Sequence, residues 1–111
     1  MISAEEGLEI LRNWRKQNAL LWLGIVEFKD AIHGPHVRVE DVLSNPSGLL
    51  LRDDDSEDLR SFDLSNATFD WWEPDSLPFS LGRGIRALGA LQIVLTGEKK
   101  EFVLVEIAFD L

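Results

Sequence analysis

Two histidines and a carboxylate near one turn could bind a metal ion. His33 and His36 lie close to Asp30, and two imidazoles with one carboxylate could hold zinc and leave one position open for water. The histidines flank Gly34 and Pro35, however, and the sequence does not define the geometry of that turn. We therefore interpret both histidines as exposed turn residues and predict no metal site.

The acidic run at residues 53–58, with the sequence DDDSED, begins like a calcium-binding loop. An EF-hand requires glycine at the sixth position and glutamate at the twelfth, and this chain has Asp58 and Leu64 there. The run is therefore interpreted as a solvated hairpin tip whose charges also oppose aggregation between sheet edges. Weak surface binding of a divalent cation is the alternative.

Residues 82–87, with the sequence GRGIRA, match a variant of the dinucleotide-binding fingerprint, and Glu106 follows about twenty residues later. The fingerprint works when a strand precedes the glycines and a helix follows, because the helix N-terminus must face the pyrophosphate. Here a proline-containing loop precedes the glycines, and residues 85–96 have a strand-like pattern. We therefore predict no nucleotide cofactor.

Nucleophilic catalysis has few candidate residues in this chain. It contains no cysteine and no tyrosine, and it has no G-x-S-x-G motif for a serine nucleophile. Carboxylate pairs are numerous, but in so acidic a sequence they carry no information without geometry. The expectation is a protein that is not an enzyme and that holds no cofactor.

The elements that must position any site begin with a helix over residues 3–17. Ser3 and Glu6 have the spacing of a capping box, and Asn18 is a plausible helix stop. The helix has one apolar stripe, formed by Ala4, Leu8, Leu11 and Trp14.

From residue 19 onward the pattern is that of strands. Residues 20–26 are apolar at successive positions, which is typical of a central strand covered on both faces, so Trp22 is expected to be largely buried. Residues 73–84 contain prolines and glycines and are expected to form a loop. The other predicted strands are residues 36–40, 48–52, 59–64, 67–72, 85–96 and 102–111.

Together these elements predict one α+β domain over residues 1–111. Its expected fold is an N-terminal helix packed on a curled antiparallel sheet of about six strands, and one version is a small Sm-like or SH3-like barrel. In the last hairpin, matching of polarity places Leu95 opposite Val103 and Leu91 opposite Ile107. Phe109 would then cover Gly89.

The charge balance bears on the partners of the protein. Twenty acidic residues and eleven basic residues give a net charge of −9, which repels phosphate backbones and anionic lipid. The closest approach to a basic cluster is Arg83 with Arg86 and Lys99 with Lys100. The N-terminal residues lack the pattern of a signal peptide, and residues 19–26 are too few to span a bilayer. We expect a cytoplasmic protein that binds neither nucleic acid nor membranes.

One aromatic segment stands out in the chain. Its two adjacent tryptophans either both lie inside a sheet that is covered on both faces, or one of them faces a partner or a pocket. Alternation places Phe69 and Trp71 on one face of a strand and Trp72 on the other. The following loop mixes apolar and polar residues and ends at an arginine, as the centres of protein interfaces do. The predicted function is a protein-interaction module that binds itself or another protein, and an aromatic-lined small-molecule pocket is the alternative. The predicted contact residues are Trp72, Leu77, Phe79, Leu81 and Arg83.

Overall fold

The fold was analysed in a computed structural model, which describes residues 1–25, 35–44, 47–77, 84–96 and 100–109. The described residues form one α-helix, seven strands and a short 3₁₀ helix. The elements in chain order are α1 (Ala4–Gln17), β1 (Leu21–Ile25), β2 (His36–Ser44), β3 (Ser47–Asp53), β4 (Leu59–Asp63), β5 (Ala67–Trp72), η1 (Pro74–Ser76), β6 (Ile85–Leu95) and β7 (Lys100–Phe109).

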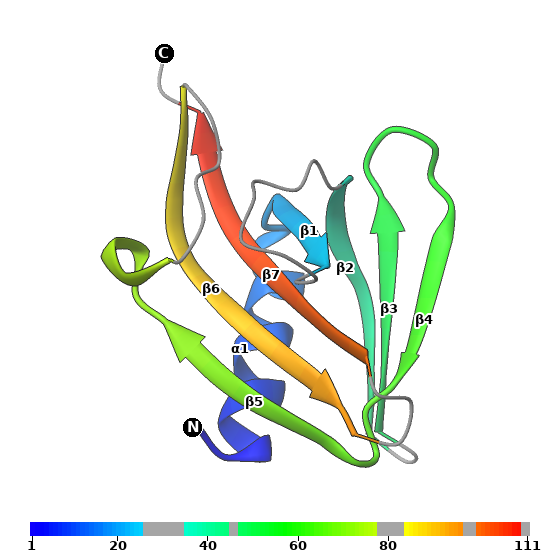
Figure 1. The fold of residues 1–111 in the computed structure, drawn as a ribbon. Helices are drawn as coiled ribbons and strands as arrows, with labels where there is room; N and C mark the ends of the chain where they lie inside the picture. The colour runs from blue at the N-terminus through cyan, green and yellow to red at the C-terminus, as the bar shows by residue number, and fades with distance from the viewer. Residues whose placement is uncertain (26–34, 45–46, 78–83, 97–99, 110–111) are drawn as a thin grey trace.

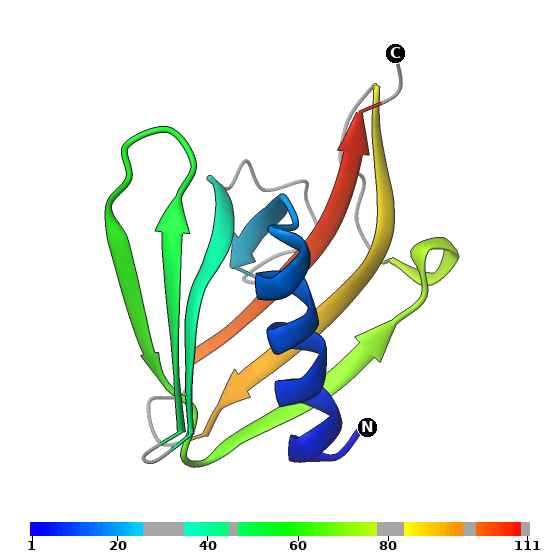
Figure 2. The same ribbon diagram turned by 180° about the vertical axis from the view of Figure 1, so that it is seen from behind.

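The seven strands form one antiparallel sheet in the order β4-β3-β2-β1-β7-β6-β5. Helix α1 lies against one face of this sheet (Figures 1 and 2). The predicted α+β class is therefore confirmed, with seven strands where about six were expected. The sheet is curled, since Phe62 of β4 stacks on Phe102 of β7 with ring centroids 4.5 Å apart.

The curled sheet does not close, so the barrel version of the prediction is wrong. Strands β4 and β5 follow one another in the chain but form the two opposite edges of the sheet. The helix explains the opening in physical terms. Leu11 and Trp14 of α1 fill the concave side with buried side chains, so the apolar interior is covered without strand-to-strand closure.

Both ends of α1 follow from its capping residues. The Ser3 hydroxyl oxygen accepts a hydrogen bond from the Glu6 backbone N–H at 3.1 Å, which satisfies one of the free donors of the first turn. Asn18 ends the helix in the left-handed conformation with φ of 51°. The expected apolar stripe is confirmed at Leu11 and Trp14, whereas Leu8 is half-buried and Ala4 is exposed.

The sheet buries apolar side chains on both faces. The helix-side cluster lies between the sheet and α1, and it includes Leu21 and Leu23 of β1. The outer cluster lies on the other face and consists of Trp22, Ala90, Val103, Val105 and Ile107. Successive residues of β1 thus enter different clusters, as the sequence predicted for a central strand. Trp22 is 9% exposed, so its predicted burial is confirmed.

The predicted register of the last hairpin is wrong. Leu95 pairs with Lys100, and Leu91 pairs with Leu104 instead of Ile107. Matching of polarity could not choose between the two registers, because β6 and β7 are apolar on both faces. The register also shifts between Ala87 and Gly89, where a bulge adds a residue to one strand.

Gly89 is covered by an aromatic ring, but not by the predicted one. A Cβ atom at Gly89 would lie 2.2 Å from Cζ2 of Trp71 on β5. Phe109 pairs instead with Ile85, the first residue of β6. An aromatic side chain thus lies over a strand glycine, as expected, and it comes from the neighbouring edge strand.

Gly7 allows α1 to approach β5. A Cβ atom at Gly7 would lie 2.5 Å from Cγ of Phe69, and Phe69 is 3% exposed and cannot move into solvent. We expect Gly7→Leu to lower the free energy of unfolding by about 1–3 kcal/mol through overpacking, despite the better helix propensity of leucine. Urea unfolding checks this value. The exposed helix position Asn13 supplies the control Asn13→Leu, and equal stability of the two variants would contradict close packing at Gly7.

Candidate contact surfaces

The predicted contact residues lie at the end of β5 and after it. Trp72 pairs with Ala90 and packs against the outer cluster. Leu77, which follows η1, packs against the same cluster, and both side chains are half-buried. The other predicted contact residues, Phe79, Leu81 and Arg83, lie outside the described residues.

The two adjacent tryptophans enter different parts of the fold. Trp71 packs against the helix-side cluster, with its ring 6.2 Å from that of Trp14 at an interplanar angle of 42°. Trp72 faces the outer cluster. The opposite orientation expected from strand alternation is therefore confirmed, and the 3% exposure of Phe69 places it with Trp71 on the helix side.

The outer cluster continues to the protein surface at one end. Ile85 packs against it and pairs with Phe109. Phe109 faces the same side as Ile107, because the two residues are two positions apart on one strand. Ile107 is 6% exposed, whereas Phe109 is 51% exposed. We define the outer patch as Trp72, Leu77, Ile85 and Phe109.

The structure describes part of the histidine motif and part of the glycine motif found in the sequence. His36 begins β2, and its ring lies edge-on to Phe109 at 6.0 Å. His33 and Asp30 lie outside the described residues. Within the part of the chain that the structure describes, no group of three His, Cys, Asp or Glu side chains could hold a metal ion. Strand β6 begins directly after Gly84, so no helix follows the glycines as a dinucleotide site requires.

The acidic run forms the tip of the β3–β4 hairpin, as interpreted from the sequence. The Asp53 carboxylate accepts hydrogen bonds from the backbone N–H groups of Ser56, at 3.1 Å, and Asp55, at 2.9 Å. These bonds hold the pKa of Asp53 below its ordinary value. The Ser65 hydroxyl and backbone N–H do the same to the pKa of Asp63. Both carboxylates therefore stay ionised, which suits structural acceptors better than proton donors.

A second surface feature is a groove between α1 and strands β2 and β3. Its volume is about 630 Å³. Four cationic side chains and two carboxylates line it, and the described lining contains no aromatic side chain. We call it the helix–strand groove. Its charged lining consists of Arg12, Arg15, Lys16 and Arg52 with Glu9 and Glu40.

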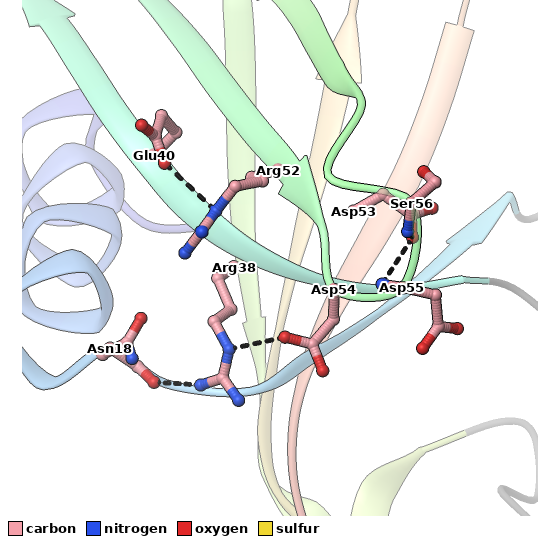
Figure 3. Close-up of polar contacts among 8 residues, drawn as sticks. All are labelled: Asn18, Arg38, Glu40, Arg52, Asp53, Asp54, Asp55 and Ser56. Carbon is pink, nitrogen blue, oxygen red and sulfur yellow. Dashed lines mark hydrogen bonds and ion pairs between the residues drawn. The ribbon is translucent and has the colours of Figure 1, made fainter.

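Two of the cations are fixed by a bulge in β2. The register of β2 shifts between Val39 and Asp41, and the Glu40 backbone carbonyl there accepts a hydrogen bond from Nε of Arg15 at 3.0 Å. The Glu40 carboxylate forms an ion pair with Arg52 at 3.3 Å (Figure 3). Glu40 therefore positions one arginine from the helix and one from β3.

A further arginine ties the helix end to the hairpin tip. Arg38 of β2 donates to the backbone carbonyl of Asn18, and its Nε lies 2.8 Å from the Asp54 carboxylate (Figure 3). This side chain thus bridges the C-terminus of α1 and the β3–β4 hairpin. The bridge holds the helix end beside β2 at Asn18, which lines the groove.

Arg12 and Lys16 differ from their neighbours in the groove. They are exposed, they lie four residues apart on α1, and neither forms an ion pair with any of the described residues. Residues at this spacing are neighbours on the helix surface, so the two positive charges lie side by side.

Sequence reasoning missed this group of cations. The basic residues that lie close together in the chain are a different set. Arg86 and Lys100 lie on β6 and β7, and Arg83 and Lys99 lie outside the described residues. The groove instead joins residues of α1 to Arg52, which is far away in sequence. The available signal was the spacing of Arg12, Arg15 and Lys16, which share one helix face.

Within the described residues, no helix is both long and apolar enough to cross a membrane.

No protein-family model, no curated protein and no solved structure matches this chain.

Proposed function

We propose that this chain is a non-enzymatic protein-interaction module that contacts its partner through the outer patch and through the residues predicted from the sequence alone, Phe79, Leu81 and Arg83. The observation that carries the proposal is the 51% exposure of Phe109, which follows the buried residues Val103, Val105 and Ile107 on the same face of β7. The partner is a second copy of the chain or another protein.

The composition of the outer patch supports this proposal. Aromatic side chains that are partly fixed by packing are frequent anchors of protein interfaces, because they bury a large area at a small cost in conformational entropy. Trp72 packs against the buried outer cluster, and Phe109 lies edge-on to His36 and pairs with Ile85, which packs against that cluster. An apolar patch on a monomer is a solubility liability, and covering it with a partner removes that liability.

The electrostatics support a protein partner and a non-enzymatic role. General acids in enzymes need a raised pKa and a sheltered position, whereas Asp53 and Asp63 have lowered pKa values and accept local hydrogen bonds. The net charge of −9 disfavours nucleic acid and anionic membranes as partners. A cytoplasmic location is part of the same proposal.

The proposal predicts that position 109 contacts the partner. Phe109→Ser should leave the circular dichroism spectrum unchanged, because the side chain is half exposed at a strand end, and it should shift a self-associated parent protein toward monomer in light scattering. For a different partner, a photo-crosslinking amino acid at position 109 should capture a protein in cells. Leu59 is 58% exposed on the distant edge strand β4, and Leu59→Ser or a crosslinker at position 59 is the matched control.

Two results together would exclude this surface. One is a parent protein that stays monomeric at high concentration. The other is a crosslinker at position 109 that captures no more protein than the crosslinker at position 59.

A further inference from the structure

We propose that the helix–strand groove binds an acidic segment of a partner protein. This inference does not depend on the outer patch, which lies on the other face of the sheet. It rests on the charge, the fixed geometry and the size of the groove.

The charge of the groove is opposite in sign to that of the chain. Four cations and two carboxylates line the groove, whereas the chain as a whole carries −9. The cations Arg12 and Lys16 lie at i and i+4 on α1 and have no ion pair with any described residue. Like charges at this spacing destabilise a helix slightly, and a bound anion would relieve the repulsion.

The other two cations are already held in position. Arg15 is fixed by the Glu40 carbonyl, and Arg52 is fixed by the Glu40 carboxylate. Cations held in one geometry lose less side-chain entropy when a ligand binds. The groove therefore combines two preset arginines with two cations that are free to meet a ligand.

The size and the apolar part of the groove favour a polypeptide over a small ion. A volume of about 630 Å³ is far larger than one carboxylate or phosphate needs. Val42, which is half-buried, contributes an aliphatic surface to the lining, whereas Val39 is only 6% exposed. The matching ligand has acidic side chains on either side of a small aliphatic one, so that the acids meet the cations while the aliphatic group covers Val42.

The carboxylates of the groove disfavour nucleic acid. A phosphate backbone presents negative charge at close and regular intervals, and its binding depends on many uninterrupted Lys and Arg contacts. Glu9 and Glu40 interrupt the cations of the groove. Asp41 lies 3.8 Å from Arg15 and adds a further negative charge. A peptide can place its acids between these carboxylates, whereas a regular polyanion cannot.

The test uses a short labelled peptide built from pairs of glutamates separated by valines, titrated against the full chain by fluorescence anisotropy at low salt. The groove variant is Arg12→Glu with Lys16→Glu. The control variant is Arg86→Glu with Lys100→Glu, which changes two exposed cations of β6 and β7 and alters the net charge equally. Circular dichroism verifies that both variants are folded.

We expect the groove variant to bind the peptide at least about tenfold more weakly than the parent, since two attractive charge pairs become repulsive. The control variant should keep its affinity within about twofold, and physiological salt should weaken binding to the parent. The Phe109→Ser variant should bind the peptide as the parent does, which separates this inference from the proposed function.

Several outcomes would overturn the inference. The first is that the parent does not bind the peptide. The second is that both double variants lose affinity equally, and the third is that a peptide with lysine in place of glutamate binds equally well. Tighter binding of a single-stranded oligonucleotide would make nucleic acid the ligand. A parent dimer that the groove variant alone converts to monomer would make a second copy the occupant.

Discussion

Replacing Trp22 by alanine is expected to lower the free energy of unfolding by about 3–5 kcal/mol. The side chain is 9% exposed and forms part of the outer cluster with Val103, Val105 and Ile107. Its ring also lies over Gly24, where a Cβ atom would come within 2.4 Å of the Trp22 Cζ3 atom. Truncation therefore leaves a cavity beside a glycine that has no side chain to fill it.

Thermal unfolding gives the measurement for Trp22→Ala. In a domain of this size each kcal/mol shifts the Tm by roughly 4 °C, so the Tm should fall by more than about 10 °C. Leu59→Ala removes an apolar side chain that is 58% exposed on β4, and this control should change the Tm little. A Trp22→Ala protein with a Tm within two or three degrees (roughly 0.5 kcal/mol) of the parent would show that the outer cluster does not stabilise the fold.

Trp14→Ala should be similarly destabilising, by about 3–5 kcal/mol, because this residue joins α1 to the sheet. Trp14 is 4% exposed, and its ring packs at 6.2 Å from that of Trp71. Its indole N–H donates to the Glu106 carboxylate at 3.2 Å. Removal of the side chain thus opens a cavity and takes a donor away from a half-buried carboxylate.

Two conservative variants separate these contributions. Trp14→Phe keeps an aromatic ring but loses the donor, and it should cost about 1–2 kcal/mol. Glu106→Gln keeps an acceptor for the indole and should stay close to the parent in urea unfolding. If Trp14→Phe were as unstable as Trp14→Ala, a smaller aromatic ring without the donor would contribute nothing to holding the helix on the sheet.

The parts of the fold that the sequence predicted are those that local chemistry determines. The Ser3 side chain defines the start of the helix and the left-handed backbone of Asn18 defines its end, because each acts within one helical turn. The uninterrupted apolar run of β1 indicated a strand covered on both faces, and Leu21 and Trp22 confirm it by entering different clusters. Such signals need no knowledge of distant partners.

The same doubly apolar pattern explains the error in the last hairpin. The pairing register of two strands can be predicted from the sequence when one face of the sheet is polar, because a slip by one residue would then expose apolar side chains. Val103, Val105 and Ile107 face one cluster while Phe102 and Leu104 face the other, so the three-residue slip from Leu95 opposite Val103 to Leu95 opposite Lys100 exchanges two apolar faces at little cost in polarity. The bulge near Leu88 then shifts the pairing again, and Gly89 beside it is a local signal of such a bulge.

The candidate sites show the same division between local and distant information. The opposite orientations of Trp71 and Trp72 follow from alternation along one strand. The helix–strand groove exists because α1 packs beside β2 and so brings Arg12 near Arg52. That meeting depends on the tertiary fold, and a search for neighbouring basic residues cannot find it.

The position of β1 in the middle of the sheet affects how the chain can fold. Leu23 of β1 pairs with Leu104 of β7, so this contact closes a loop of about 80 residues, which carries a larger entropy cost than a hairpin. The β2–β4 and β5–β7 segments need only local closures. During synthesis on the ribosome, β1 cannot pair with β7 until residues 100–109 have also been made. The two local segments can form first, and joining them through β1 is then the slow, non-local step of folding.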